Sequence, residues 1–388
     1  MEYYRKVLLH MKSNPKILLV ANVAKEHVLK FHVPTIKMLR ENGWYVDVAC
    51  AGEEMIPYCN QQFQMSYKRT PFTLKTFVGI RELTKIINRG EYDIIYCHTP
   101  VGGMVARIAA RKARKKGCKV IYFVHGYHFY CGAPKQNWII YYSIEKVLAK
   151  MTDSIILINQ EDYELAKAKF KKCKVYLLNG IGVDLKRLEV SRENKPLIRS
   201  DYRKEMNIPN NAIVLIYLAE LIKNKNQIFL MDVLKETLRR NENIFLVLAG
   251  IDHSNGEVMK YAEKLGVSSH VRFLGWRDDI SNLYTMSDIC TATSIREGFG
   301  LNLVEAMVCG VPIVATKNRG HETIIKDGEN GFLVSQGDVE MFTKRVLQLI
   351  EDEKLRSKMI ENGLLASQIY SSEVILKNIR NILKEHIK

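Results

Sequence analysis

Two glutamates placed eight residues apart, Glu297 and Glu305, mark the stretch of this sequence best suited to binding a polar ligand. The stretch runs from Ser294 to Gly310 and reads S-I-R-E-G-F-G-L-N-L-V-E-A-M-V-C-G, so polar and glycine residues give way to good helix formers. It is predicted to be a loop that leads into a helix, with both glutamates on the same side. Gly298 and Gly300 remove side chains that would keep a ligand from the N–H groups at the helix N-terminus, where an anion such as a phosphate fits.

The surroundings of this stretch favour a functional role. Taken alone, two glutamates on an amphipathic helix are usually a solvated face, and G-x-G is a weak signal. The stretch, however, follows the apolar run 289–292 and precedes a second apolar run, V-P-I-V-A. Both runs are predicted to be buried strands, so the loop lies at the carboxyl end of a strand, where open α/β sheets bind ligands.

Composition limits the class of protein. The chain has 388 residues, enough for two domains, and its 47% hydrophobic and 9% aromatic residues are typical of a globular protein. Lys and Arg outnumber Asp and Glu by 58 to 42, and the net charge of +16 indicates an anionic partner: a nucleotide, a nucleic acid or a membrane surface. Eight cysteines without a C-x-x-C motif fit a reducing cytoplasm, no apolar run approaches the roughly 18 residues of a membrane span, and residues 1–16 lack a signal peptide's apolar core. We expect a cytoplasmic protein that at most attaches to a membrane face.

The elements that must position the glutamates alternate between strands and helices in two rounds. This predicts an α/β protein with two doubly wound parallel-sheet domains facing a cleft, an N-terminal one at 1–185 and a C-terminal one at 186–369. The last helix, about 370–388, either closes the second domain or crosses back to the first. The first β-α-β unit lacks G-x-G-x-x-G, which disfavours a nicotinamide enzyme. Strands are expected at 16–22, 45–51, 92–98, 119–124, 154–158 and 175–178, and again at 212–219, 244–249, 271–273, 289–292 and 313–315.

Polar residues end several strands of the first round. His98 ends one predicted strand, His125 follows the next beside Gly126, and the loop from Asn22 to His27 follows the first strand. A histidine at such a place can contact a polar sugar or phosphate, although a histidine that only pins its loop is the alternative.

The segment 105–119 is unusually basic. Such a run is most often a solvated face, and contact with an anionic membrane or another polyanion is the alternative. It lacks a matching bulky apolar face, so insertion into lipid is not expected. Its cations are Arg107, Arg111, Lys112, Arg114, Lys115, Lys116 and Lys119.

Several motifs together resemble those of one enzyme family. The stretch R-E-G-F-G-L-N-L-V-E-A-M-V-C-G-V-P-I-V-A resembles the E-x7-E signature of the retaining glycosyltransferases of family 4, which have the two-domain GT-B fold. F-H-V-P-T-I-K-M-L further resembles bacterial members that build capsular polysaccharide, exopolysaccharide or O-antigen units. The supporting motifs are V-H-G at 124–126, N-G-I-G-V-D at 179–184, L-x3-K-N at 221–226, F-L-G-W at 273–276 and D-G-E-N-G-F-L-V at 327–334.

The resemblance implies a role for each matching residue. Glu297 would hold hydroxyls of the donor hexose, Glu305 would accept both ribose hydroxyls, and Lys225 would neutralise the diphosphate. His125 would reach the transferred sugar from the other domain, as a catalytic residue together with Glu297. Backbone amides of Gly298, Phe299, Gly300 and Leu301 would face the sugar and diphosphate, the loop of Gly275, Trp276 and Arg277 would lie along the base, and Asn22, His27 and His98 are acceptor-side candidates.

Two positions depart from the family pattern. Where the family usually has an arginine shortly before the lysine, this chain has Glu220, which cannot grip a diphosphate, so Arg277 or Lys223 is a hypothetical substitute. The glutamate usual after the glycine near 320 is also displaced, and Glu322 comes one place early.

The resemblance implies a reaction that moves a hexose or N-acetylhexosamine, with retention, from a nucleotide sugar to a saccharide or polyprenyl-diphosphate-linked acceptor in surface polysaccharide synthesis. A UDP-sugar is the expected donor. No cofactor and no metal are expected, since no D-x-D triplet occurs. A sugar-nucleotide epimerase of the same architecture is the nearest rival and would need no acceptor. A nucleic-acid-binding protein would explain the charge, but no module or aromatic-basic interleaving indicates one. A glycoside hydrolase is least favoured, because the two glutamates would flank a whole nucleotide sugar and not one glycosidic bond.

Overall fold

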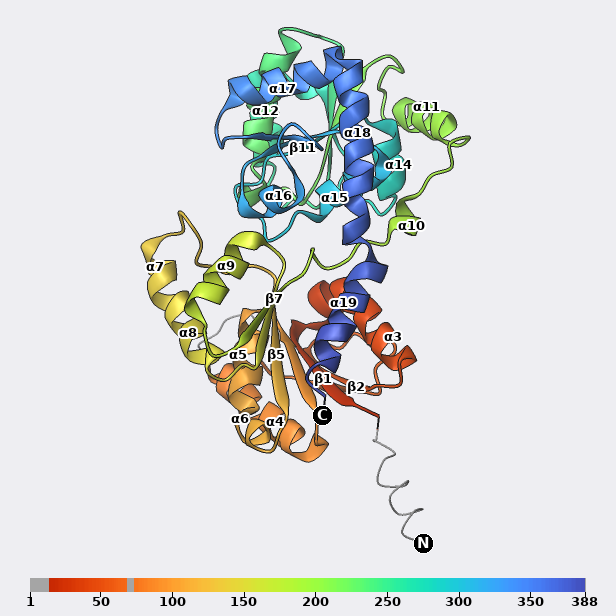
Figure 1. Ribbon diagram of the computed structural model, residues 1–388. Coiled ribbons are helices and arrows are strands. Elements are labelled where there is room, and N and C mark those ends of the chain that lie inside the picture. Colours follow the sequence, from red (N-terminus) through yellow and green to blue (C-terminus); the bar gives the residue numbers. More distant parts are fainter. Residues whose placement is uncertain (1–13, 68–72, 388) are drawn as a thin grey trace. The chain divides into compact units, whose positions relative to one another are not determined.

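The computed structural model describes residues 14–67 and 73–387, which form two compact units (Figure 1). The first unit ends at Ile181 and takes in the C-terminal segment from Glu373, and the second runs from Gly182 to Ser372. The sequence placed the corresponding boundaries at residues 185 and 369. The expectations for residues 1–13 lie outside the described part of the chain.

A parallel sheet forms the centre of the first unit. In the described residues it consists of β1 (Lys16–Val23), β2 (Tyr45–Ala51), β3 (Gln61–Gln64), β4 (Ile94–His98), β5 (Lys119–Val124), β6 (Ser154–Leu157) and β7 (Lys174–Leu177), in the order β3-β2-β1-β4-β5-β6-β7. Its central strands are buried almost throughout, which explains their continuous apolar sequences. The edge strand β3 was missed, because Q-Q-F-Q carries little strand signal.

Helices connect these strands. They are α3 (Val33–Glu41), α4 (Leu74–Gly90), α5 (Pro100–Ala109), α6 (Arg111–Lys115), α8 (Ser143–Ala149), α9 (Gln160–Lys169) and α19 (Ser372–Lys384), with short turns η1 (Ala24–Val28), α2 (Leu29–Phe31), α7 (Lys135–Asn137) and η2 (Trp138–Tyr142). Residues 24–27, expected in a loop, instead form most of the π-helical turn η1. Among the described helices, none has the length and apolar composition needed to cross a bilayer.

The final helix α19 belongs to the first unit. The hydroxyl of Tyr176 donates a hydrogen bond to Glu385 at 2.6 Å, and the guanidinium of Arg380 donates one to Asn42 at 2.8 Å. Of the two placements left open by the sequence, the structure therefore has the helix crossing back to the first domain.

The second unit repeats the architecture. Its described strands are β8 (Ile213–Leu218), β9 (Ile244–Ala249), β10 (Val271–Phe273), β11 (Ile289–Ala292), β12 (Ile313–Thr316) and β13 (Phe332–Val334), all parallel and in the order β10-β9-β8-β11-β12-β13. In each sheet the strand order reverses at one place, between β1 and β4 and between β8 and β11. Loops at the carboxyl ends of strands that flank such a reversal form the usual ligand site of this architecture.

The connections of the second unit are mostly helical. They are α10 (Leu185–Leu188), α11 (Lys195–Glu205), η3 (Lys223–Lys225), α12 (Gln227–Leu238), α13 (Glu257–Leu265), η4 (Ser268–His270), α14 (Ile280–Met286), α15 (Leu301–Cys309), α16 (Arg319–Ile324), α17 (Val339–Glu351), α18 (Glu353–Ser367) and η5 (Gln368–Tyr370).

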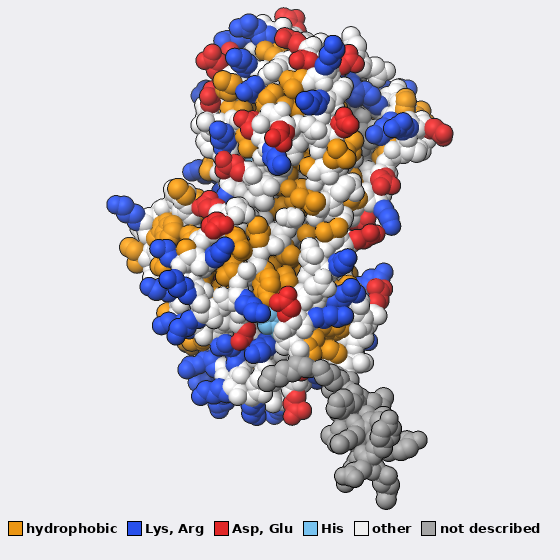
Figure 2. Space-filling view, in the orientation of Figure 1, with side chains coloured by type: hydrophobic (Ala, Val, Ile, Leu, Met, Phe, Trp, Pro, Cys, Tyr) orange, Lys and Arg blue, Asp and Glu red, His pale blue; other side chains and the backbone are white. Residues whose placement is uncertain are grey.

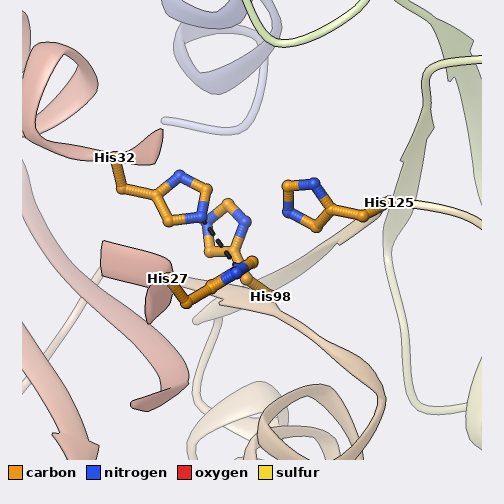
Figure 3. A group of neighbouring side chains, drawn as sticks. All are labelled: His27, His32, His98 and His125. Carbon is orange, nitrogen blue, oxygen red and sulfur yellow. Dashed lines mark hydrogen bonds between the residues drawn. The ribbon is translucent and has the colours of Figure 1, made fainter. Parts of the chain in front are cut away.

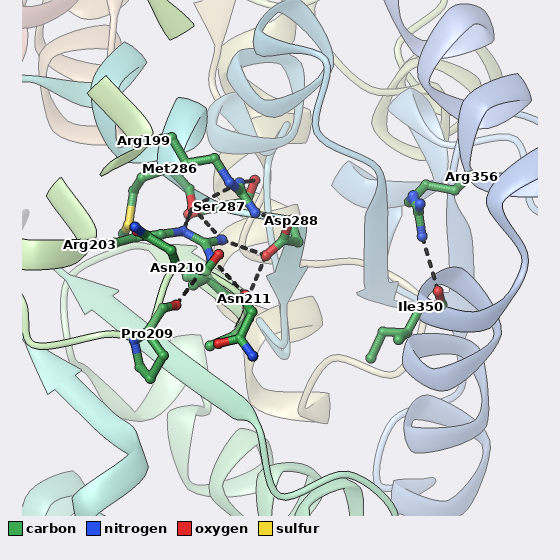
Figure 4. A network of polar contacts seen from close by, with 12 residues as sticks. Arg199, Arg203, Pro209, Asn210, Asn211, Met286, Ser287, Asp288, Ile350 and Arg356 are labelled. Atoms are coloured by element: carbon green, nitrogen blue, oxygen red, sulfur yellow. Dashed lines mark hydrogen bonds and ion pairs between the residues drawn. The ribbon is translucent and has the colours of Figure 1, made fainter. Parts of the chain in front are cut away.

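A buried arginine fixes α11 to this unit. Although the sequence from 189 to 209 reads as a polar linker with a capping helix, Arg203 is fully buried. Its guanidinium pairs with Asp288 at 2.8 Å and donates to the carbonyls of Met286, Asn210 and Ala212 (Figure 4). The other carboxylate oxygen of Asp288 pairs with Arg199 at 2.6 Å. These partners satisfy the buried guanidinium of Arg203, so this helix is an integral part of the second unit.

Candidate active site

The loop with the two glutamates lies at the reversal point of the second sheet. It leaves the fully buried strand β11, which pairs with β8 on one side and β12 on the other. The helix α15 then begins at Gly300, whose φ of +104° is one that L side chains rarely adopt. The predicted strand, loop and helix are therefore confirmed, and the N-terminus of the helix directly follows the loop.

Glu297 is held by two side chains. Its Oε1 atom accepts hydrogen bonds from Lys225 Nζ at 2.5 Å and from Ser294 Oγ at 2.6 Å. Burial alone would raise the pKa of Glu297, but the Lys225 ammonium and these hydrogen bonds reverse the effect and leave the pKa below its ordinary value. Glu297 is therefore an ionised acceptor with Oε2 still available to a ligand hydroxyl.

The loops that carry Lys225 and Glu297 are joined by further hydrogen bonds. The backbone N–H of Ile295 donates to the carbonyl of Asn224 at 2.8 Å, and the side chain of Asn224 donates to the carbonyl of Arg296 at 2.9 Å. These bonds connect the loop after β8 with the loop after β11. They hold the ammonium and the carboxylate at the place where the strand order reverses.

Glu305 lies on α15 in a different environment. It is largely buried, and burial raises its pKa to about 7, although the nearby charge of Arg187 opposes the shift. In the part of the chain that the structure describes, it has no hydrogen bond or ion pair. Such a carboxylate gains from a ligand that donates hydrogen bonds to it.

The start of α16 packs against the Glu297 loop, which the sequence did not reveal. A Cβ atom added to Gly320 would lie 2.6 Å from Cβ of Glu297 and 2.8 Å from the carbonyl oxygen of Phe299. The neighbouring Arg319 is buried, and its Nε donates to the carbonyl of Glu297 at 3.3 Å. His321 donates from Nδ1 to the carbonyl of Thr316 at 2.7 Å. In the sequence, only the residues N-R-G-H at 318–321 could have indicated this contact. Glu322, the displaced glutamate that follows them, is exposed.

The loop of Gly275, Trp276 and Arg277 follows β10. Gly275 accepts a hydrogen bond from the backbone of Gly250 at 2.7 Å, and Trp276 is 67% exposed. The guanidinium of Arg277 forms an ion pair with Asp279 at 2.5 Å and a second one with Glu205 at 3.4 Å. Because both ion pairs occupy the guanidinium of Arg277, this residue is a poor substitute for the missing cation at the diphosphate. Lys223, the other substitute named from the sequence, is exposed.

In the first unit, the structure brings three of the predicted histidines together. His27, His98 and His125 lie in one cluster with His32, which the sequence analysis did not single out. Burial and the neighbouring His27 lower the pKa of His125 to about 3, so its ring is neutral at physiological pH. A neutral imidazole can donate a hydrogen bond from one ring nitrogen and accept one at the other.

Asn22 joins two elements of the first unit. Its side-chain oxygen accepts a hydrogen bond from the backbone of Gly102 at 2.6 Å, which joins the end of β1 to the start of α5. It also borders a cavity of about 270 Å³ whose wall includes Tyr127, Phe129 and Tyr141. The aromatic sequence after His125 thus lines a pocket within the first unit.

The basic segment 105–119 only partly matches the expectation of a solvated or membrane-facing surface. Arg107 is fully buried, forms a bidentate ion pair with Glu145 at 2.7 and 2.9 Å, and lies over the ring of Tyr122. Arg114 pairs with Asp153 at 2.9 Å. Including these two in a membrane-binding surface was wrong, because each has an internal carboxylate partner. The exposed cations of the segment are Arg111, Lys112, Lys115 and Lys116.

Comparison with known proteins gives consistent matches over both units. A family model described as glycosyl transferase 4-like matches residues 16–159, and one described as glycosyl transferases group 1 matches residues 198–365. A Bacillus subtilis protein named as the glycosyltransferase EpsD is 39% identical over 96% of this chain and 97% of that protein. The UDP-Gal:alpha-D-GlcNAc-diphosphoundecaprenol alpha-1,3-galactosyltransferase of Escherichia coli is 26% identical over 75% of this chain and 76% of that enzyme.

A solved structure supports the fold. The structure of Anabaena HepE in complex with UDP and glucose has a TM-score of 0.77 at 22% identity and covers 96% of this chain and all of that one. The GT-B class of two Rossmann-like parallel-sheet domains is confirmed. The chain therefore belongs to the glycosyltransferases with a 4-like N-terminal domain and a group 1 C-terminal domain, as its motifs indicated, and it is a glycosyltransferase.

Proposed function

We propose that the second unit binds a UDP-sugar, and that the enzyme transfers its hexose or N-acetylhexosamine, with retention, to a saccharide or lipid-linked acceptor of surface polysaccharide synthesis. The observation that carries the proposal is the placement of Glu297, Lys225 and the start of α15 at the reversal point of the second sheet. The site combines an ionised acceptor for sugar hydroxyls, a cation for phosphate and helix N–H groups for an anion.

The two glutamates would bind opposite ends of the donor. Glu297 would accept hydroxyls of the sugar, beside backbone amides from Gly298 to Leu301. Glu305 would accept both ribose hydroxyls, which supplies the hydrogen-bond donors that its buried carboxylate lacks in the described residues. The loop from Gly275 to Arg277 would border the base with its backbone and with Trp276.

Lys225 would neutralise the diphosphate as it leaves. The ammonium of Lys225 is paired with the carboxylate of Glu297. A bound diphosphate would either replace Glu297 as its partner or contact the ammonium together with Glu297. Arg319 is a candidate for a second cation, because its Nε donates a hydrogen bond to the carbonyl of Glu297 in the same loop. Neither role requires a metal ion on the diphosphate.

The relatives support the donor and acceptor classes. The E. coli relative is named for a UDP-galactose donor and a diphosphoundecaprenol-linked acceptor, and the HepE structure contains UDP and glucose. For this chain, His125 would donate or accept a hydrogen bond at the transferred sugar, with His27 and His98 on the acceptor side. His125 would remain neutral in this role.

A lipid-linked acceptor would place the enzyme in the cytoplasm at the inner membrane face. The four exposed cations of α6 and its C-terminal turn are suited to anionic lipid headgroups, each contributing about 1 kcal/mol near such a surface. Figure 2 shows Lys and Arg side chains gathered over the part of the first unit that carries α4 and α6. We expect no comparable affinity for nucleic acid at physiological ionic strength.

A panel of nucleotide sugars tests the proposal. The purified chain is screened by thermal shift against UDP-, GDP- and dTDP-sugars, and the stabilising donor is then incubated with and without undecaprenyl-diphosphate-linked sugars. A UDP-sugar that stabilises the chain and is consumed with the acceptor supports the proposal. Preference for a GDP- or dTDP-sugar overturns the donor assignment, and transfer to none of the lipid-linked sugars, with transfer to a free saccharide instead, overturns the lipid acceptor.

A further inference from the structure

We propose that His27, His32, His98 and His125 together bind one divalent transition-metal ion of the zinc type within the first unit. The four side chains come from separate places in the sequence: the turn η1, the residue before α3, the end of β4 and the loop after β5. They meet where the order of the first sheet reverses, between β1 and β4. The four histidines lie in the first unit, whereas Glu297, Glu305 and Lys225 of the proposed donor site lie in the second.

The spacing of the rings fits a single ion. One nitrogen from each of the four rings can be chosen so that all four lie within 4.8 Å of one another, and the Nε2 atoms of His27 and His32 are 3.1 Å apart. With Zn–N bonds of about 2.0–2.1 Å, a tetrahedral ion separates its ligand nitrogens by about 3.3 Å and the centres of its imidazole rings by about 5.2 Å.

The separations of the observed ring centres scatter on both sides of this value. Their separations range from 3.9 Å, between His32 and His98, to 6.3 Å, between His27 and His98. His27 and His125 are separated by 4.8 Å. The required separation lies within this range, so a bound ion would draw the rings of His27 and His98 closer together and move those of His32 and His98 apart. Figure 3 shows the four rings gathered around one small space.

The cluster also contains polar atoms without partners. His98 is fully buried, and neither of its ring nitrogens has a hydrogen-bond partner among the described residues. Nε2 of His125 is buried and equally without a partner. Buried nitrogens of this kind normally have a partner, and a bound metal ion would provide one for each ring.

The histidines are in the protonation state that a metal requires. Burial lowers the pKa of His32 and of His98 well below the ordinary value, and the neighbouring histidines lower both further. Both rings are therefore neutral, and an ion would not have to displace protons from them. Zinc and similar borderline ions favour imidazole nitrogen, whereas magnesium and calcium favour oxygen ligands.

Two further features are compatible with the site. His27 and His125 are only half-buried, which leaves the cluster accessible to an ion from solvent. A histidine that binds metal through one nitrogen keeps its second nitrogen for a hydrogen bond, so His125 can also contact a sugar. The ion would join four segments of the chain and stabilise the first unit.

The alternative is a metal-free aromatic cluster, in which His27 and His32 share one hydrogen bond. Metal binding by the full-length chain without an affinity tag distinguishes the two. The protein is stripped with a chelator, dialysed against Zn²⁺ alone and its metal content measured. The variants are His98→Phe, which keeps a buried ring, and His27→Gln, at a half-buried position. His253→Ala removes an exposed histidine outside the cluster and is the matched control.

The proposal predicts about one Zn²⁺ per chain for the wild type and for His253→Ala, and a Zn²⁺ affinity at least about 100-fold weaker for both cluster variants. Substitution with Co²⁺ should give the visible absorption of a tetrahedral site, and Zn²⁺ should raise the Tm of the wild type only when the cluster is intact. Substoichiometric zinc in the wild type, or equal zinc in wild type and His27→Gln, would overturn it. No nucleotide is present, so the result is independent of the proposed donor site.

Discussion

The Lys225 ammonium and the Glu297 carboxylate form an ion pair of 2.5 Å between loops that leave neighbouring strands of the second sheet. Both side chains are largely buried, so solvent screens their attraction less than in an exposed pair, and each charge offsets part of the desolvation cost of the other. Lys225 is proposed to bind the negatively charged diphosphate of the donor. Glu297 is proposed to bind the hydroxyls of the donor sugar. Together the ammonium and the carboxylate carry no net charge.

Replacing Lys225 by alanine should weaken UDP binding. A hydrogen bond between charged groups contributes about 1.5–3 kcal/mol, so the Kd for UDP, measured by calorimetry, should rise about 10- to 150-fold. Lys223→Ala is the matched control, because Lys223 lies on the same 3-10 turn and is exposed. An equal loss in both variants would assign the effect to general charge and not to the ion-paired lysine.

Glu305→Gln should change the dependence of stability on pH. The pKa of Glu305 is raised from 4.5 to about 7, so the folded protein binds more protons than the unfolded chain between these values. The wild type therefore loses stability as pH rises from about 4.5 to 7, and the buried charge is fully present above that range. The variant should have a Tm several °C higher than the wild type at pH 8 and a similar Tm at pH 4.5. Glu322→Gln, at an exposed position, should show no such difference at either pH.

Gly320→Ala should impair donor binding without unfolding the protein. The new Cβ atom would press on backbone atoms of Phe299 and on Cβ of Glu297, so the loop has to move. We expect the Kd for the UDP-sugar to rise at least about 10-fold, since small displacements of binding groups have large effects. Gly363→Ala is the control, because its added Cβ would meet Met307 at an ordinary 3.4 Å. Normal donor affinity in the Gly320 variant would show that the contact is not needed.

Arg203→Ala should destabilise the second unit. The substitution leaves a half-buried Asp288 with one fewer cation and removes the donors to the carbonyls of Met286, Asn210 and Ala212. Breaking such a pair costs about 3–5 kcal/mol, which chemical denaturation should detect. Arg192→Ala, at an exposed position before α11, should cost less than about 0.5 kcal/mol. Similar stabilities for the two variants would contradict the structural role of Arg203.

Local sequence patterns were sufficient for most of the fold. The strands Ile244–Ala249 and Ile289–Ala292 have the predicted bounds, because apolar runs determine both. The edge strand Gln61–Gln64 was missed, since its pairing with β2 is a tertiary contact and its sequence is polar. The break at Ala110 between α5 and α6 also has no sequence signal of its own.

Contacts between distant residues set the limit for the site. The motif located Glu297 and Glu305, but their different pKa values depend on Lys225 and on burial, which the motif does not contain. The sequence of the basic stretch 105–119 reveals its positive charge. It does not reveal that Arg107 and Arg114 pair with Glu145 and Asp153, which lie more than thirty residues further along the chain. His32 joins the other histidines only because the sheet brings three strand ends together.

The central claim is that the two glutamates bind opposite ends of one nucleotide sugar. Calorimetric titration of uridine, UDP and the UDP-sugar identified in the panel tests it directly in the variants Glu305→Gln and Glu297→Gln. We predict that Glu305→Gln weakens all three ligands by a similar factor, because each contains the ribose, and that Glu297→Gln weakens only the UDP-sugar. Unchanged uridine binding in Glu305→Gln, or an equal loss of uridine and UDP-sugar binding in Glu297→Gln, would contradict the account.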